Sequence, residues 1–166
     1  MTDFGRLIGT LVDNAVEFIV IGGMAATAHG SAHVTVDLDL VYRRTADNID
    51  RLASALAPFD PYLRGAPPGL PFRFDPETIR RGLNFTLVTS LGDLDVLGEA
   101  TGNGTYEALL AHTQLHQVFA HACRFVDLET LIRLKRAAGR PKDLERIAEL
   151  EALVEGTVLP LAGRIR

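Results

Sequence analysis

The sequence predicts an α/β domain, and three observations carry this prediction. Residues 18–21 form a short apolar run rich in β-branched side chains, which is typical of a buried strand. Residues 36–41 alternate apolar and acidic side chains, as a second strand would. Segments with helical character follow at 24–29 and 48–56, and an order of strand, helix, strand and helix indicates α/β architecture. With 166 residues, of which 47% are hydrophobic, the chain can bury one core, and a second domain is not expected.

The composition argues against a disulfide-bonded, zinc-binding or membrane-spanning protein. The single cysteine, Cys123, excludes an internal disulfide framework and agrees with a reducing compartment. Together with His112, His116 and His121 it shows no recognised zinc-ligand spacing, so a zinc site is not expected. The N-terminal residues lack the pattern of a signal peptide, and no apolar run is long enough for a spanning helix, so we expect a cytoplasmic protein without membrane contact. A net charge of −4 means that any contact with RNA would require a local basic patch.

The first half of the chain supplies the expected packing elements. Apolar residues between Phe4 and Val12 recur at three- and four-residue spacing, which predicts an amphipathic helix. The helix at 48–56 should end before Pro58. Residues 58–76 hold six of the eight prolines, which predicts irregular backbone of the kind that often borders a site.

The second half contains clear helix and turn signals. Asp75 as N-cap and Pro76 at the first helical position predict a short helix that ends near Gly82. Residues 85–89 and 93–97 predict a β-hairpin with Gly92 in the turn, and a short helix is expected at 105–111. A further strand or hairpin is expected within 117–126. Two helices should follow, one from the Asp127 cap to Ala138, ended by Gly139, and one from Pro141 to about Val154.

Gly22 and Gly23 end the first predicted strand and precede a short helical segment. Glycine has no side chain, so another group can approach the backbone closely at these two positions. The first N–H groups of a helix are unpaired and attract anions. A phosphate would therefore fit beside the two glycines.

Two pairs of alternating aspartates are the strongest chemical signal. On a strand, Asp37 and Asp39 point to the same face, roughly 6–7 Å apart along it. Asp93 and Asp95 repeat the pattern in the second arm of the predicted hairpin, and either could supply a third carboxylate. An acidic strand face is usually only solvated, but aspartate is disfavoured in strands, and such conflicts concentrate at functional sites. Mg²⁺ prefers hard oxygen ligands of this kind, together with substrate phosphates.

These residues carry a resemblance to a known superfamily. The pattern Ile21-Gly22-Gly23, a gap of thirteen residues, and Asp37-Leu-Asp39-Leu resembles the signature of the DNA polymerase β-like nucleotidyltransferases. Residues 134–144, Leu-Lys-Arg-Ala-Ala-Gly-Arg-Pro-Lys-Asp-Leu, are similar to small bacterial members of toxin–antitoxin and phage abortive-infection systems. The resemblance implies the nucleotidyltransferase fold, a mixed sheet flanked by helices. The whole chain, 1–166, would be one such domain with a C-terminal helical pair at about 128–155.

The resemblance also implies a reaction and roles for residues. A nucleoside monophosphate would pass from an NTP to an acceptor with release of pyrophosphate, assisted by two Mg²⁺ ions. Asp37 and Asp39 would hold both ions. Asp95 would hold the catalytic ion and help to deprotonate the acceptor hydroxyl. Gly22 and Gly23 would cradle the triphosphate.

Lys135 stands out by helical periodicity. It falls near the centre of the apolar face of its predicted helix, where an unpaired lysine is unusual. Its ammonium should either extend past the helix edge to solvent or reach an inward anion, for which the triphosphate is the natural candidate. The nearby Arg140, Lys142 and Asp143 could form a capped turn with a local ion pair or bind the acceptor.

Two functional hypotheses follow. The first is an active, Mg²⁺-dependent nucleotidyltransferase that acts on RNA, above all a tRNA end, or on a protein, within a toxin–antitoxin system. The second is a nucleotide-binding or partner-binding module, antitoxin-like, that has lost turnover. The presence of all three acids favours activity.

Overall fold

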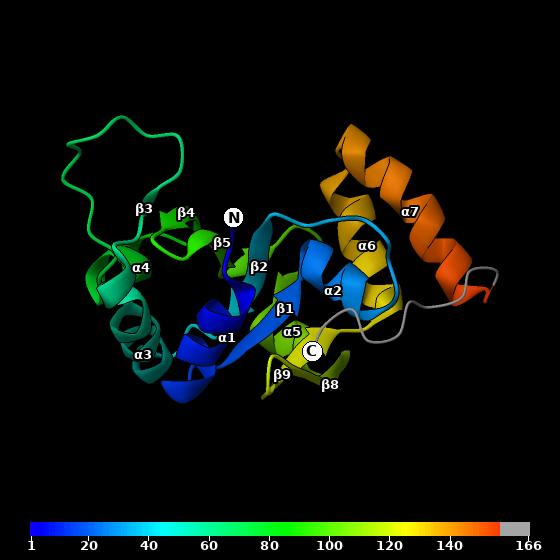
Figure 1. The fold of residues 1–166 in the computed structure, drawn as a ribbon, viewed down its shortest axis with the longest axis horizontal. Coiled ribbons are helices and arrows are strands. Elements are labelled where there is room, and N and C mark those ends of the chain that lie inside the picture. The colour runs from blue at the N-terminus through cyan, green and yellow to red at the C-terminus, as the bar shows by residue number, and fades with distance from the viewer. Residues whose placement is uncertain (157–166) are drawn as a thin grey trace.

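Seven strands form one mixed sheet with the order β3-β4-β5-β2-β1-β9-β8 (Figure 1). A computed structural model describes residues 1–156. In the sheet β2 is parallel to β5 and β1 is parallel to β9, while the other neighbours are antiparallel. The strands are β1 (Phe18–Ile21), β2 (Asp37–Tyr42), β3 (Tyr62–Leu63), β4 (Asn84–Thr89), β5 (Gly92–Leu97), β8 (Thr113–Val118) and β9 (His121–Val126). A separate pair joins β6 (Glu99–Ala100) to β7 (Gly104–Thr105).

Helices pack on this sheet and on one another. Helix α1 contacts α3 and β9, whereas α2 lies against β1, β2 and α6, and α6 packs against α7 (Figure 1). The side chains that face away from the acidic side of β2, Leu38 and Leu40, are fully buried. The helices are α1 (Phe4–Asp13), α2 (Gly22–Ala28), α3 (Ala46–Leu56), α4 (Pro76–Arg81), α5 (Tyr106–Leu110), α6 (Leu128–Ala138) and α7 (Pro141–Val154), with a 3₁₀ turn at Ala57–Phe59.

The capping signals of the sequence are confirmed. The Asp75 side chain accepts a hydrogen bond from the Thr78 N–H at the start of α4, and Asp127 accepts one from the Thr130 N–H at the start of α6. Helix α6 ends at Gly139, whose φ of +65° is left-handed and favours glycine. Helix α7 begins two residues later at Pro141, because proline is well suited to the first position of a helix.

The structure departs from the sequence expectations in several places, among them Gly92, which begins β5 instead of lying in the hairpin turn. The proline-rich segment 58–76, expected to be irregular throughout, contains the edge strand β3. The helix after β1 begins at Gly22 rather than Met24, and β8 begins at Thr113, four residues before the expected strand. Strands β6 and β7 were not expected. Residues 157–166, which belong to the predicted single domain, lie outside the described residues.

None of the helices within residues 1–156 is both long enough and apolar enough to span a membrane.

Candidate active site

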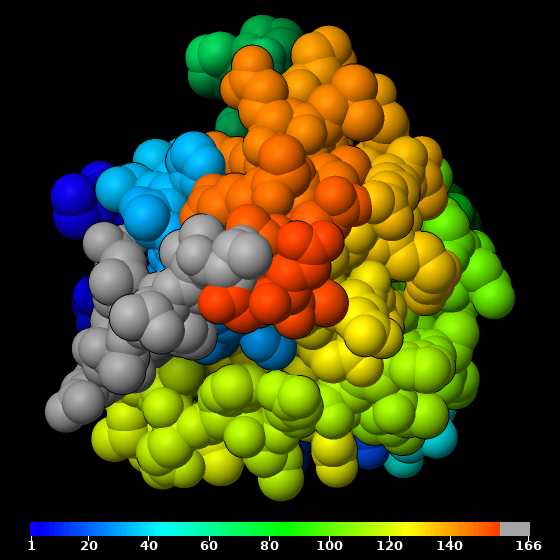
Figure 2. Space-filling view, turned by 90° about the vertical axis from the view of Figure 1, so that its right-hand side faces the viewer, coloured from blue at the N-terminus to red at the C-terminus, as the bar shows by residue number. Residues whose placement is uncertain are grey.

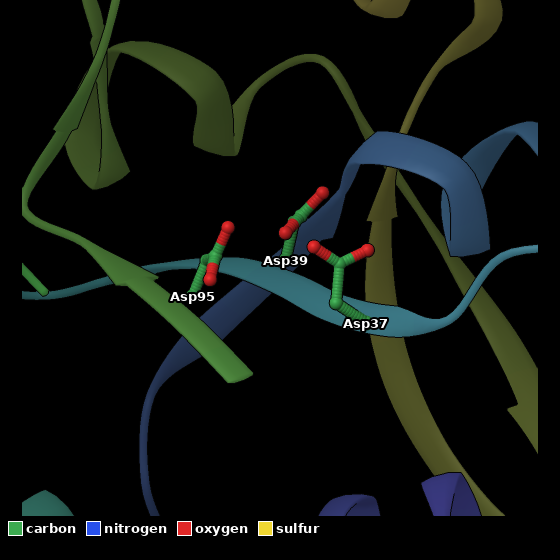
Figure 3. Close-up of side chains that lie close together, drawn as sticks. All are labelled: Asp37, Asp39 and Asp95. Carbon is green, nitrogen blue, oxygen red and sulfur yellow. The ribbon is translucent and has the colours of Figure 1, made fainter. Parts of the chain in front are cut away.

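The parallel pairing of β2 with β5 brings the aspartates together. In this register Asp37 lies beside Asp93, and Asp39 lies beside Asp95. Figure 3 shows the carboxylates of Asp37, Asp39 and Asp95 close together on the same side of the two strands. Each offers an oxygen atom, and these oxygens lie within 4.8 Å of one another. Of the two candidates for the third acid, Asp95 is the one that joins this group, which we call the acidic cluster.

The electrostatics of the acidic cluster favour a bound cation. Burial, followed by repulsion from the Asp37 and Asp95 carboxylates and a hydrogen bond with Asp95, raises the pKa of Asp39 to about 8. Its Oδ1 atom is buried and has no hydrogen-bond partner within residues 1–156. A divalent ion would satisfy this oxygen and relieve the repulsion, so the residues present fit a hard metal ion such as Mg²⁺.

The two glycines lie directly against the acidic cluster. Gly22 has a φ of +67°, and a Cβ atom there would overlap the Asp39 carboxylate. A Cβ on Gly23 would lie 2.6 Å from Thr35 Oγ1. The sequence predicted that another group approaches the backbone closely at these glycines, and in the structure Asp39 and Thr35 are such groups. Both glycines also line the cavity beside the cluster.

The cavity has a volume of about 730 Å³, and ligand pockets of this order hold small molecules. Its floor includes the acidic cluster, and other parts of its lining come from residues 34–36 and from the α6–α7 pair. Figure 2 shows the segment at 30–36 (light blue) beside α7 (orange), where Glu149 accepts a hydrogen bond from the Ala32 N–H and pairs with His33. The lining residues from the helical pair include Lys135, Arg140, Lys142, Asp143 and Arg146.

Lys135 points inward rather than to solvent. Its side chain is only 11% exposed, and its Nζ atom lies 3.8 Å from Oδ1 of Asp143, which is 2% exposed. Burial lowers the pKa of Lys135, and the negative charges of Asp143 and Asp39 offset part of this effect. Asp143 also accepts two hydrogen bonds from the Arg140 guanidinium, at 2.7 and 3.2 Å. The local ion pair expected in this turn is thus present, and Asp143 is an inward anion for Lys135 that helical periodicity did not identify.

Arg64 is a residue of the site that sequence reasoning missed. It directly follows β3, and its guanidinium lies 2.9 Å from Asp95, 3.5 Å from Asp93 and 3.9 Å from Asp37. The only available signal was the proline-rich segment itself, since such loops often border a site. The charge of Arg64 could not be assigned to the cluster without knowing that β3 pairs with β4.

The histidines and Cys123 do not assemble into a metal site. Among residues 1–156, the acidic cluster is the only group of three or more potential ligands that lie close enough together. His116 instead stacks edge-on against His29 and Phe125.

Comparisons with known proteins bear on the fold. No protein-family model matches the chain, and no curated protein matches it either. Among solved structures, a candidate nucleotidyltransferase from Thermotoga maritima is similar with a TM-score of 0.51, at 12% identity, over 95% of each chain. The antibiotic-resistance factor ANT(2'')-Ia has a TM-score of 0.56 at 12% identity, over 92% of this chain and 82% of its own. The protein therefore shares the fold of these two structures, with the mixed α/β sheet that the sequence motif implied.

Proposed function

We propose that the protein is a Mg²⁺-dependent nucleotidyltransferase that transfers a nucleoside monophosphate from an NTP to an acceptor. The observation that carries this proposal is the acidic cluster at the floor of a large cavity, where three carboxylate oxygens lie within 4.8 Å of one another. The shared fold adds support. Carboxylates held this closely are costly unless a cation binds between them, so a metal-dependent reaction explains their arrangement.

The three aspartates have distinct roles in this proposal. Asp37 and Asp39 would hold two divalent ions, and Asp95 would hold one of them and help to deprotonate the acceptor hydroxyl. The bound ions would neutralise the triphosphate and the developing negative charge of an in-line displacement. The Oδ1 atom of Asp39 is buried, which shields it from competing water.

Gly22, Gly23 and Lys135 form the proposed triphosphate site. The glycines line the cavity next to Asp39, so phosphate oxygens bound there would lie close to their backbone. Lys135 lines the same cavity, and its ammonium is held near its present position by Asp143. An ammonium that is already ordered and partly desolvated loses little entropy when it binds a phosphate.

We propose RNA, and above all a tRNA end, as the acceptor, with a protein as the alternative. Arg140, Lys142 and Arg146 line the cavity on the α6–α7 side. They supply the local basic patch that a chain with a net charge of −4 needs for contact with a phosphate backbone. A role in a toxin–antitoxin pair, with a cognate partner protein, belongs to the same proposal and rests on the similarity of residues 134–144 to such proteins.

The test uses the purified protein, Mg²⁺ and each labelled NTP in turn, incubated with cell extract. Transfer is expected with at least one NTP, and the label should be removed by RNase but not by protease. Removal by protease alone would identify a protein acceptor. Absence of transfer with every NTP, in the presence of Mg²⁺ and of Mn²⁺, would contradict the proposed activity.

A specific observation favours a second candidate, a nucleotide-binding or partner-binding module without turnover. The guanidinium of Arg64 already neutralises part of the acidic cluster without any metal. Such a module would bind Mg-ATP in a calorimetric titration and yet give no labelled product in the extract assay.

A further inference from the structure

Arg64 lies against two carboxylates that a metal ion would need. Its Nη2 atom lies 2.9 Å from Oδ1 of Asp95, and its Nη1 atom lies 3.9 Å from Oδ2 of Asp37. Both aspartates belong to the acidic cluster. A guanidinium keeps its positive charge at any relevant pH, so it can leave these oxygens only by moving.

The structure holds Arg64 in this position from two directions. The backbone N–H of Arg64 donates a hydrogen bond to the Thr86 carbonyl at 3.0 Å, which extends the pairing of β3 with β4 by one residue. Its Nη2 atom donates to the Leu87 carbonyl at 2.7 Å. The side chain is 28% exposed, so it is not a freely solvated surface arginine. Beyond Arg64 the chain leaves the sheet as a long loop that leads to α4 (Figure 1).

Asp93 gives the guanidinium of Arg64 a further carboxylate partner. Its Oδ2 atom lies 3.5 Å from Nε of Arg64, and Asp93 is not a member of the acidic cluster. Arg64 thus stands between one carboxylate that a metal would use and one that a metal would not use. A small movement toward Asp93 would release the Asp95 oxygen and leave the guanidinium paired.

We propose that Arg64 is a built-in counter-ion of the acidic cluster, which competes with divalent metal for Asp95 and Asp37 and moves toward Asp93 when metal is bound. The inference rests on the proposed function in so far as that function assigns these carboxylates to metal. Its consequence is that the site binds free metal weakly, because each ion must displace a cation already in place. Metal that arrives together with a triphosphate overcomes this competition, since the phosphates supply further ligands and further negative charge.

The test is a direct titration of Mn²⁺ without nucleotide, in which free Mn²⁺ is followed by electron paramagnetic resonance. Arg64→Gln is expected to bind Mn²⁺ roughly tenfold more tightly than the wild type, the effect of removing one charge-assisted contact. Arg73→Gln is the matched control, because Arg73 is exposed and lies in the same segment without a described contact to the cluster. Its affinity should equal that of the wild type. Asp39→Asn, combined with Arg64→Gln, should abolish the gain and so assign it to this site.

Arg64→Lys distinguishes the effect of the guanidinium contacts from the effect of the positive charge. It also provides the test if Arg64→Gln does not fold. A lysine keeps the charge but lacks the planar fork that joins the Leu87 carbonyl to Asp95. Its Mn²⁺ affinity should therefore exceed that of the wild type by a smaller factor. Mn²⁺ binding by Arg64→Gln and Arg64→Lys that is equal to or weaker than that of the wild type, or absent, would overturn the proposal. Tighter binding by Arg64→Gln together with failure of the transfer assay would instead retain the counter-ion and reject the proposed activity.

Discussion

Asp39 is the residue on which the proposed reaction depends most directly. Burial and its two acidic neighbours raise the pKa of Asp39 to about 8, and its Oδ1 atom has no hydrogen-bond partner within residues 1–156. Asp39→Asn should abolish Mg²⁺-dependent transfer while the protein remains folded, because the amide keeps the shape but cannot hold the metal. Its stability at neutral pH should be unchanged or higher, since the variant lacks the buried carboxyl group whose ionisation is unfavourable in the folded protein. Transfer assays and circular dichroism on the same preparation provide the measurement, and unchanged turnover would exclude this site.

Asp95 and Asp93 can be distinguished in the same assay. Asp95 lies beside Asp39 in the strand register and contributes to the acidic cluster, whereas Asp93 lies beside Asp37 and pairs with Arg64. Asp95→Ala should therefore remove transfer, and Asp93→Ala should lower it only modestly. The reverse order of effects would mean that Asp93, and not Asp95, serves as the third acid.

Lys135 offers a test of the triphosphate site. Lys135→Met keeps most of the volume of the stem, and Asp143 retains its two hydrogen bonds from Arg140, so the fold should persist. Loss of one charge-assisted contact to phosphate should weaken Mg-ATP binding roughly ten- to a hundredfold in a calorimetric titration. Arg136→Met is the control, because Arg136 is largely exposed and pairs with Glu151. Equal affinities of the two variants would show that Lys135 does not contact the nucleotide.

At the scale of elements, α3 is fixed to the sheet by a buried amide. Asn48 is fully buried, its Oδ1 atom accepts a hydrogen bond from the Glu17 N–H, and its Nδ2 atom donates to the carbonyls of Glu17 and Arg43. These bonds join the start of β1 and the end of β2 to the first turn of α3. Asn48 therefore helps to position β1, which leads into Gly22, and β2, which carries Asp37 and Asp39.

Asn48→Ala should lower the free energy of unfolding by about 2–5 kcal/mol, because three backbone groups lose a buried partner. Asn14→Ala is the matched control. Asn14 is exposed and donates one hydrogen bond, to the Thr10 carbonyl, so its loss should cost about 1 kcal/mol or less. Urea denaturation of both variants measures the difference, and similar losses would show that the buried amide does not anchor α3.

The elements that the sequence predicted share local signals. Caps and turn residues such as Asp75, Asp127 and Gly139 act within four residues, and the boundaries of α4 and α6 followed from them. Alternation likewise indicated that two aspartates share a face of β2, and a hairpin bounded by Gly92 placed the second pair. These features depend only on neighbours along the chain.

The parts that escaped prediction depend on contacts between distant segments. Strand β3 has only two residues in a proline-rich stretch, and its existence depends on pairing with β4. Arg64 reaches the acidic cluster only because of that pairing. The contact of Lys135 with Asp143 joins two helices, and the periodicity of one helix cannot specify a partner on the next.

For the whole molecule, the local arrangement of charge matters more than its sum. The net charge is only −4, yet the floor of the cavity concentrates carboxylates, and the α6–α7 part of its lining concentrates cations. A metal–triphosphate complex carries both signs and can satisfy both parts at once. Before it binds, Arg64 and Asp143 supply the opposite charges from within the chain.

This arrangement predicts how the stability of the metal-free protein depends on pH. The pKa of Asp39 is raised from 3.8 in the unfolded chain to about 8 in the folded one, so between these values the folded state binds the extra proton. Stability should therefore fall as pH rises from about 4 to about 8, by up to about 1.4 kcal/mol per pH unit from this group. Urea denaturation of the wild type and Asp39→Asn at several pH values, in the presence of a chelator, isolates this contribution. The wild-type stability should decline relative to the variant across this range, and parallel profiles would show that Asp39 is ionised in the folded protein well below pH 8.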